Sequence, residues 1–142
     1  FKKIDILINS AGTNVEHRDW DVINKRDWDN IFQTNVNGLF YCCKSILPYM
    51  KQQKDGLIIN VSSWAGKEVS LLSGVTYTSS KHAVNAMTET INMKYCNVGI
   101  RACALCPGEV ATPNSPIPAD LASGEISKKG TPVVITLLLF WE

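Results

Sequence analysis

Three short apolar runs alternate with two long stretches of helical periodicity, and this order limits the fold more than any other feature of the sequence. The runs are IDILIN at 4–9, LIINVSS at 57–63 and IRACALC at 100–106. Between them, apolar residues recur in steps of three and four over 25–54 and 75–97, which predicts two helices. Strands that are apolar almost throughout are typical of a parallel sheet covered on both faces. The sequence therefore predicts an α/β fold.

Polar and small residues stand where each predicted strand ends. In open parallel sheets, ligands bind beyond the carboxyl ends of the strands. The residues at those ends are Asn9-Ser10-Ala11-Gly12, Ser62-Ser63 and Pro107-Gly108. We therefore expect a binding site at this edge of the sheet.

Tyr77 and Lys81 are four residues apart at the start of the second predicted helix. This spacing places both side chains on one face, one turn apart. An ammonium beside a phenol favours the phenolate, so such a pair is suited to moving a proton. A Tyr-x-x-x-Lys spacing taken alone also arises by chance, and an ordinary polar start to a helix remains the alternative reading of these two residues.

The composition excludes several classes of partner. The 142 residues are 45% hydrophobic, and the formal net charge is +1. One globular domain is expected, without the charge that nucleic acids or anionic membranes attract. No secretory signal is visible, and the longest apolar run, residues 133–141, is too short to span a bilayer. We expect a cytoplasmic protein.

The cysteines and histidines do not suggest a disulfide framework or a metal site. The five cysteines are an odd number, and Cys103 and Cys106 would point to opposite faces of a strand. We expect them to be buried, free thiols that pack as small hydrophobic side chains. His17 and His82 are far apart in the sequence, and we expect no metal ligand among the residues of the chain.

Five motifs give the strand ends and helices a more specific interpretation. They are NSAG at 9–12, NVNG at 35–38, SSWAG at 62–66, YTSSK at 77–81 and PGEVAT at 107–112. Their order and spacing resemble the short-chain dehydrogenase/reductase family over residues 1 to about 113. The resemblance implies a Rossmann-type doubly wound parallel sheet. It also implies hydride transfer between NAD or NADP and a small carbonyl or alcohol, such as a 3-oxoacyl compound, another ketone, or a sugar or polyol.

The resemblance implies a role for each of four catalytic residues. Tyr77 would be the general acid that protonates the carbonyl oxygen, or the base in the reverse direction. Lys81 would favour its phenolate and hold the nicotinamide ribose. Ser63 would stabilise the substrate oxygen, with Ser62 as the competing choice. Asn35 would hold a water that connects Lys81 to solvent.

Further residues would contact the cofactor. The NSAG stretch would line its adenosine side and stabilise the sheet, although Ser10 departs from the Asn usual in the family. Pro107 and Gly108 would form a turn against the nicotinamide. The Val110 backbone would face the carboxamide, and the Thr112 hydroxyl would bond the carboxamide or a phosphate. The implied cofactor-binding residues are Asn9, Ala11, Gly12, Tyr77, Lys81, Pro107, Gly108, Val110 and Thr112.

The sequence also departs from the family. It has no G-x-G-x-x-G or T-G-x-x-x-G turn, so it resembles the catalytic half of a longer enzyme that lacks the N-terminal βαβαβ half. Residues 1–113 would form that catalytic portion, and 114–142 a Pro-rich loop with an apolar tail. The alternative is a non-catalytic fragment or pseudoenzyme that cannot bind cofactor alone. The two long helices resemble those through which the family forms homodimers or homotetramers.

Overall fold

The computed structural model describes residues 3–108, and the expectations for Val110, Thr112 and the tail fall outside them. Each predicted strand and helix is present, with the first helix divided in three. The elements are β1 (Ile6–Asn9), α1 (Lys25–Phe32), a π-helical turn (Gln33–Gly38), α2 (Leu39–Gln53), β2 (Gly56–Val61), α3 (Val75–Tyr95) and β3 (Ile100–Leu105), with 3-10 turns at Trp64–Gly66, Leu71–Ser73 and Cys96–Val98.

The three strands form one parallel sheet in the order β1-β2-β3. The register places Ile58 of β2 opposite Leu7 of β1 and Ala102 of β3. Each connection between neighbouring strands runs through helices, as parallel pairing requires. The α/β class with a parallel sheet is confirmed.

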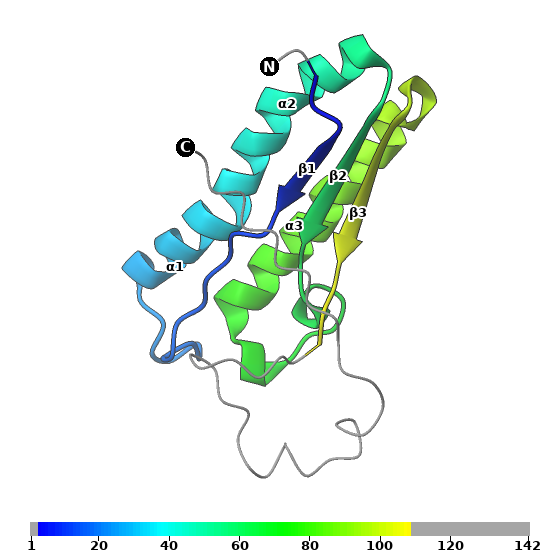
Figure 1. The fold of residues 1–142 in the computed structure, drawn as a ribbon. Coiled ribbons are helices and arrows are strands. Elements are labelled where there is room, and N and C mark those ends of the chain that lie inside the picture. Colours follow the sequence, from blue (N-terminus) through cyan, green and yellow to red (C-terminus); the bar gives the residue numbers. More distant parts are fainter. Residues whose placement is uncertain (1–2, 109–142) are drawn as a thin grey trace.

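Both long helices pack on the same face of the sheet. Figure 1 shows α2 and α3 running side by side behind the strands. The core joins Ile58 and Ile100 of the sheet to Met50 of α2 and to Val84 and Ile91 of α3. Burying each such side chain contributes about 1.5–3 kcal/mol, so this layer holds the strand ends in place.

The other face of the sheet is open in the part of the chain that the structure describes. Ile6 is 52% exposed and Leu105 is 55% exposed. Along β2 and β3, such half-buried or exposed side chains alternate with buried ones, as the strand period demands. The predicted cover on both faces is therefore found on one face only within residues 3–108.

Two side-chain amides fix the helices to the strand backbone. Gln53 of α2 accepts from the Ile4 N–H (3.0 Å) and donates to the Ile4 carbonyl (2.8 Å). Asn92 of α3 pairs in the same two-pronged way with Ala102, at 2.7 and 2.6 Å. Each amide satisfies a backbone donor and acceptor together, as a neighbouring strand would.

The expectation of buried cysteines is wrong for most of them. All five thiols are free, but only Cys43 is buried, while Cys42, Cys96 and Cys103 are exposed and Cys106 is half-buried. Cys103 is exposed because it alternates with the buried Ala102 and lies on the open face of the sheet.

Among the helices of the described residues, none has the length and apolar character needed to cross a membrane.

Candidate active site

Lys81 is a buried cation that has no carboxylate partner among residues 3–108. It lies on α3, is 3% exposed, and its Nζ donates to the carbonyl of Val61 at the end of β2 (3.0 Å). None of the ion pairs formed among residues 3–108 includes it. Burial lowers the pKa of Lys81 to about 8, against a smaller opposing effect of the Cys106 thiol. An unpaired buried ammonium is costly, which is typical of a functional position.

Tyr77 lies one helical turn before Lys81, as the spacing predicts. The Lys81 Nζ is 5.5 Å from the centroid of the Tyr77 ring. The Tyr77 side chain is half-buried, and its hydroxyl bonds to no other residue within 3–108. As far as residues 3–108 are concerned, the hydroxyl is available to a bound molecule, and the ammonium lies close to the ring.

Asn35 lies in the π-helical turn and is 1% exposed. Its Oδ1 accepts from the Thr13 N–H (2.8 Å), and its Nδ2 donates to the Thr13 carbonyl (3.0 Å) and to the Ser80 Oγ (3.0 Å). These bonds explain how an Asn, mildly unfavourable in a helix, is held inside one. Because both amide hydrogens are used, a water here would have to bind Oδ1 or the backbone.

Gly12 borders the space between Asn35 and Lys81. A Cβ built on Gly12 would lie 3.3 Å from the Lys81 Nζ and 3.7 Å from the Asn35 Oδ1. The absence of a side chain thus leaves a small polar space beside the buried ammonium. A bound hydroxyl or water would find donors and acceptors there.

The two serines after β2 differ in what their hydroxyls do. The buried Ser62 Oγ donates to the Lys81 carbonyl (3.2 Å) and so binds inside the protein. The half-buried Ser63 Oγ accepts from the Ala65 N–H (3.2 Å) as the N-cap of a 3-10 turn. An accepting hydroxyl keeps its own hydrogen, so Ser63 can still donate to a ligand.

The loop after Ser63 is attached to the end of β3. The Trp64 N–H donates to the Pro107 carbonyl, and the Ser62 N–H to the Leu105 carbonyl, both at 2.8 Å. Gly66 allows the loop to approach α3, since a Cβ there would lie 2.8 Å from the Lys81 carbonyl. Pro107 is therefore held near the serine loop, whereas Gly108 is exposed with nothing within 4 Å of an added Cβ.

Asn9 uses its side chain inside the protein. Its Nδ2 donates to the Asn60 Oδ1 (2.8 Å) and contacts the Cys43 Sγ (3.4 Å). Asn60 in turn donates to the Thr88 Oγ1 of α3 (2.8 Å). This chain of contacts links β1, β2 and α3, as expected for a residue that stabilises the sheet. Ala11 is exposed.

Sequence analysis missed Asn60, Ser80 and Asn85. Asn60 near the end of β2 and Ser62 just after it are two residues apart in an apolar run, which signals polar side chains on one buried face. Ser80 is three residues after Tyr77 and follows the helical spacing. Asn85 donates to the Gly66 carbonyl at 2.8 Å and supports the serine loop, but no motif singles it out.

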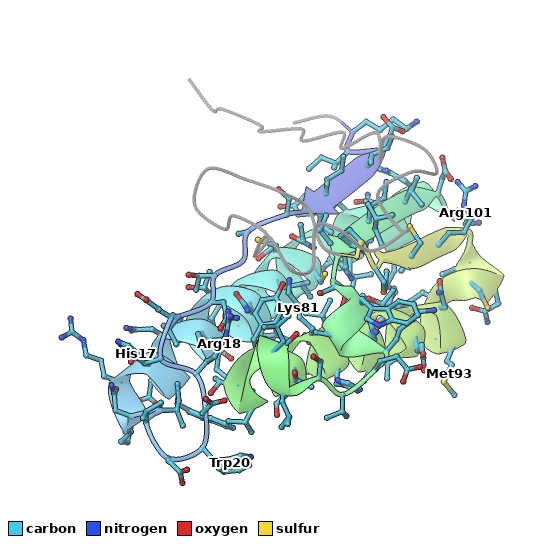
Figure 2. The ribbon with its side chains drawn as sticks, turned by 90° about the horizontal axis from the view of Figure 1, so that it is seen from below. His17, Arg18, Trp20, Lys81, Met93 and Arg101 are labelled. Atoms are coloured by element: carbon cyan, nitrogen blue, oxygen red, sulfur yellow. The ribbon has the colours of Figure 1, made fainter. Side chains whose placement is uncertain are left out.

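Other polar groups lie apart from this cluster. Figure 2 shows Lys81 between the helices, with His17, Arg18 and Trp20 displaced along the segment that connects β1 to α1. Among residues 3–108, no group of three or more His, Cys, Asp or Glu side chains could hold a metal ion.

A model of the short chain dehydrogenase family matches residues 1–118. The chain belongs to the short-chain dehydrogenase family. It is 34% identical over 113 residues to a 3beta-hydroxysteroid dehydrogenase of Mediterraneibacter gnavus, covering 80% of this chain and 40% of the relative. It is 36% identical over 115 residues to a 2-(R)-hydroxypropyl-CoM dehydrogenase of Xanthobacter autotrophicus, covering 80% and 46%. The chain thus spans less than half the length of these relatives.

Solved structures agree with this short-chain dehydrogenase assignment. The structure of ElxO with NADP bound has a TM-score of 0.76 and 30% identity, covering 80% of this chain and 46% of that one. A gluconate 5-dehydrogenase from Burkholderia cenocepacia in complex with NADP and tartrate has a TM-score of 0.72 and 29% identity, covering 77% and 42%.

Proposed function

We propose that this short-chain dehydrogenase chain carries the acid–base centre of an NAD- or NADP-dependent oxidoreductase acting on a small carbonyl or alcohol. The observation that carries the proposal is Lys81, a buried ammonium without a carboxylate partner among the described residues, 5.5 Å from the ring of Tyr77. Both lie beyond the carboxyl ends of β1 and β2, where ligands bind in such folds.

Tyr77 moves the proton in this proposal, and Ser63 holds the substrate oxygen. The free hydroxyl of Tyr77 donates to a carbonyl oxygen as it gains charge, and Lys81 stabilises the phenolate that remains. Ser63 adds a donor to the same oxygen, as in an oxyanion hole. Ser62 is less suited, because its hydroxyl is already bound to the Lys81 carbonyl.

The described residues fit the nicotinamide-ribose end of the cofactor. The polar space that Gly12 leaves beside Lys81 suits ribose hydroxyls, and Pro107 and Gly108 lie next to the serine loop. Ala11 would border the adenosine side, while Asn9 would act through the sheet that it stabilises. Val110 and Thr112 complete the proposed contacts. When bound, the cofactor would supply or accept the hydride.

The substrate proposal is limited to a chemical class. We favour a 3-oxoacyl compound or another small ketone, with a sugar or polyol as the second candidate. Similar solved structures include both a 3-oxoacyl-[acyl-carrier protein] reductase from Brucella melitensis, at 27% identity and a TM-score of 0.71, and the gluconate 5-dehydrogenase. The hydroxyls of Tyr77 and Ser63, each with a hydrogen to donate, suit the oxygen that these classes share.

Cofactor titration tests the proposal and the alternative of a fragment or pseudoenzyme that cannot bind. We expect the 142-residue chain, or the longer protein that contains it, to bind NADPH or NADH. Gly12→Ala should weaken binding about tenfold, because its Cβ would fill the polar space beside Lys81. The measurement is the quenching of intrinsic fluorescence.

Gly38→Ala is the matched control, since its Cβ would meet only the Gln33 carbonyl at an ordinary 3.6 Å. Micromolar affinity of the short chain would exclude the fragment alternative. A longer protein that bound neither nucleotide would refute the oxidoreductase proposal.

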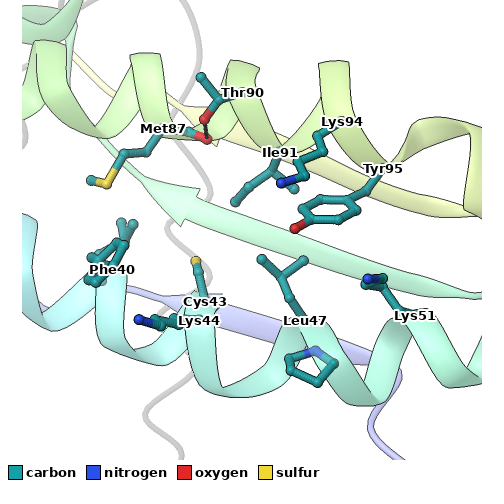
Figure 3. Close-up of a pocket in the computed structure, with 12 residues that line it drawn as sticks. Phe40, Cys43, Lys44, Leu47, Lys51, Met87, Thr90, Ile91, Lys94 and Tyr95 are labelled. Atoms are coloured by element: carbon teal, nitrogen blue, oxygen red, sulfur yellow. Dashed lines mark hydrogen bonds between the residues drawn. The ribbon is translucent and has the colours of Figure 1, made fainter.

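The outer faces of α2 and α3 are the proposed surface for homodimer or homotetramer formation. They enclose a groove of about 560 Å³ away from Tyr77. In Figure 3, Phe40, Cys43 and Leu47 of α2 face Met87, Ile91 and Tyr95 of α3 across this groove. An apolar groove between two long helices is suited to helices of a second copy.

A charge in the groove should disrupt this association. Phe40 is 45% exposed and lines the groove, so we expect Phe40→Glu to convert the oligomer of the complete protein to a monomer without unfolding it. Light scattering coupled to gel filtration measures the mass. Tyr49→Glu, an exposed α2 position outside the groove, should keep the oligomer. Equal masses for wild type and Phe40→Glu would contradict the proposed surface.

A further inference from the structure

Ser80 connects two parts of the candidate site that are far apart in the sequence. It is 0% exposed on α3, between Tyr77 and Lys81. Its Oγ accepts from the Asn35 Nδ2 (3.0 Å) and donates to the Tyr77 carbonyl (2.7 Å). The hydroxyl therefore has one bond to the π-helical turn and one to the helix turn that carries the acid.

The same connection continues to the loop after β1. Asn35 is bound to both the N–H and the carbonyl of Thr13, next to Gly12. An unbroken line of hydrogen bonds thus runs from the Thr13 backbone through Asn35 and Ser80 to the Tyr77 backbone. Every side-chain atom in this line is buried, where hydrogen bonds are strong and missing partners are costly.

We propose that Ser80 is a positioning residue, whose hydroxyl sets the place of the Tyr77–Lys81 turn relative to Asn35 and Gly12. The inference rests on the proposed function and adds a residue to it. Ser80 touches neither substrate nor cofactor in this account. It acts by holding the α3 backbone at Tyr77, so that the hydroxyl and the ammonium meet the bound molecules in the right geometry.

The neighbouring serine offers a matched comparison. Ser79 is half-buried on the same helix turn, and its hydroxyl bonds to no other residue within 3–108. Removing the Ser79 hydroxyl changes local helix propensity as much as removing that of Ser80. It leaves the line from Thr13 to Tyr77 intact.

The test compares Ser80→Ala with Ser79→Ala in the complete protein. We expect Ser80→Ala to lower kcat about tenfold or more, because small displacements of reacting groups reduce rates steeply. KM and the cofactor Kd should change less than threefold. Ser79→Ala should stay within twofold of wild type in all three. Combining Ser80→Ala with Asn35→Ala should lower kcat by less than the product of the single effects, since both break one connection.

A purely structural role predicts a different result. A lower melting temperature with wild-type kcat in the folded protein would overturn the proposal, as would multiplicative effects of Ser80→Ala and Asn35→Ala. If Ser80→Ala does not fold, Ser80→Cys keeps the volume and a weak donor, and we expect an intermediate kcat. A folded Ser80→Cys protein with the kcat and pH profile of wild type would also overturn it.

A measurement that does not require turnover tests the role of Ser80 separately from the proposed function. We expect the pH midpoint of Lys81 labelling by an amine reagent to be higher in Ser80→Ala than in wild type, because a displaced turn admits water beside the ammonium and weakens the effect of burial on its pKa. An unchanged midpoint would count against Ser80, even in a protein without activity. Absence of turnover and cofactor binding in wild type would instead refute the proposed function.

Discussion

Tyr77→Phe is expected to reduce turnover by about 10²–10⁴-fold in the active protein, the range typical of general acid–base catalysis. The substitution removes one oxygen and keeps the ring beside the Lys81 ammonium. The lost hydroxyl bonds to nothing else within residues 3–108, so neither the fold nor the cofactor affinity should suffer. Steady-state kinetics together with a cofactor titration measure the two effects.

The matched control is Tyr41→Phe, which changes an exposed tyrosine on α2. It should change turnover by less than twofold. A loss below tenfold in Tyr77→Phe would show that Tyr77 is not the acid. Loss of cofactor binding to the same degree as turnover would place Tyr77 in ground-state binding rather than in proton transfer.

Lys81→Met is expected to abolish turnover and weaken cofactor binding, yet to raise stability at neutral pH. Burial lowers the pKa of Lys81 from 10.5 to about 8 in the folded chain. Because the unfolded chain binds this proton more tightly, the charged side chain destabilises the fold below pH 8 by about 3 kcal/mol. Loss of the bond to the Val61 carbonyl costs about 1 kcal/mol in return.

The difference in stability between Lys81→Met and wild type should change sign as the pH rises. The wild type gains stability from Lys81 as the pH rises from about 8 toward 10.5, since its buried amine becomes neutral. Lys81→Met should therefore be more stable than wild type by about 1–2 kcal/mol at pH 7 and less stable above pH 10.5. Urea denaturation at the two pH values measures both differences.

Lys67→Met, at an exposed position outside the groove, controls for the general loss of one positive charge. It should show no such reversal between pH 7 and pH 10.5. A Lys81→Met protein that is less stable than wild type at pH 7 would mean that the hydrogen bond outweighs the burial of charge.

Periodicity was sufficient to predict the strands and the long helices within residues 3–108. The strands at β1, β2 and β3 and the helices around Leu39–Gln53 and Val75–Tyr95 follow from apolar spacing, because burial on one side requires those periods. The π-helical turn at Gln33–Gly38 could not be predicted in this way. Its Asn35 side chain pairs with the backbone of Thr13, which lies 22 positions earlier, and such a contact leaves no trace in the local periodicity.

The hydrogen bonding and burial of individual side chains could not be predicted from the sequence either. The motif SSWAG favoured Ser63 over Ser62 by register alone. The structure supplies a physical difference, because the Ser62 hydroxyl is bound to the Lys81 carbonyl while Ser63 keeps a hydrogen to donate. In the same way, the exposure of Cys103 follows from the sheet being open on one face within the described residues, which the sequence did not show.

The sequence by itself determined the α/β class, the order of strands and helices, and the one-turn spacing of Tyr77 and Lys81. These are local properties, fixed by side-chain periodicity and helix geometry. Only the tertiary structure decided that Lys81 is buried without a carboxylate partner among the described residues, and that Gly12, Asn35 and Ser80 surround the Tyr77–Lys81 turn. Those properties depend on which distant backbone and side-chain groups meet, and hydrogen bonds between segments far apart in the sequence leave no periodic signal.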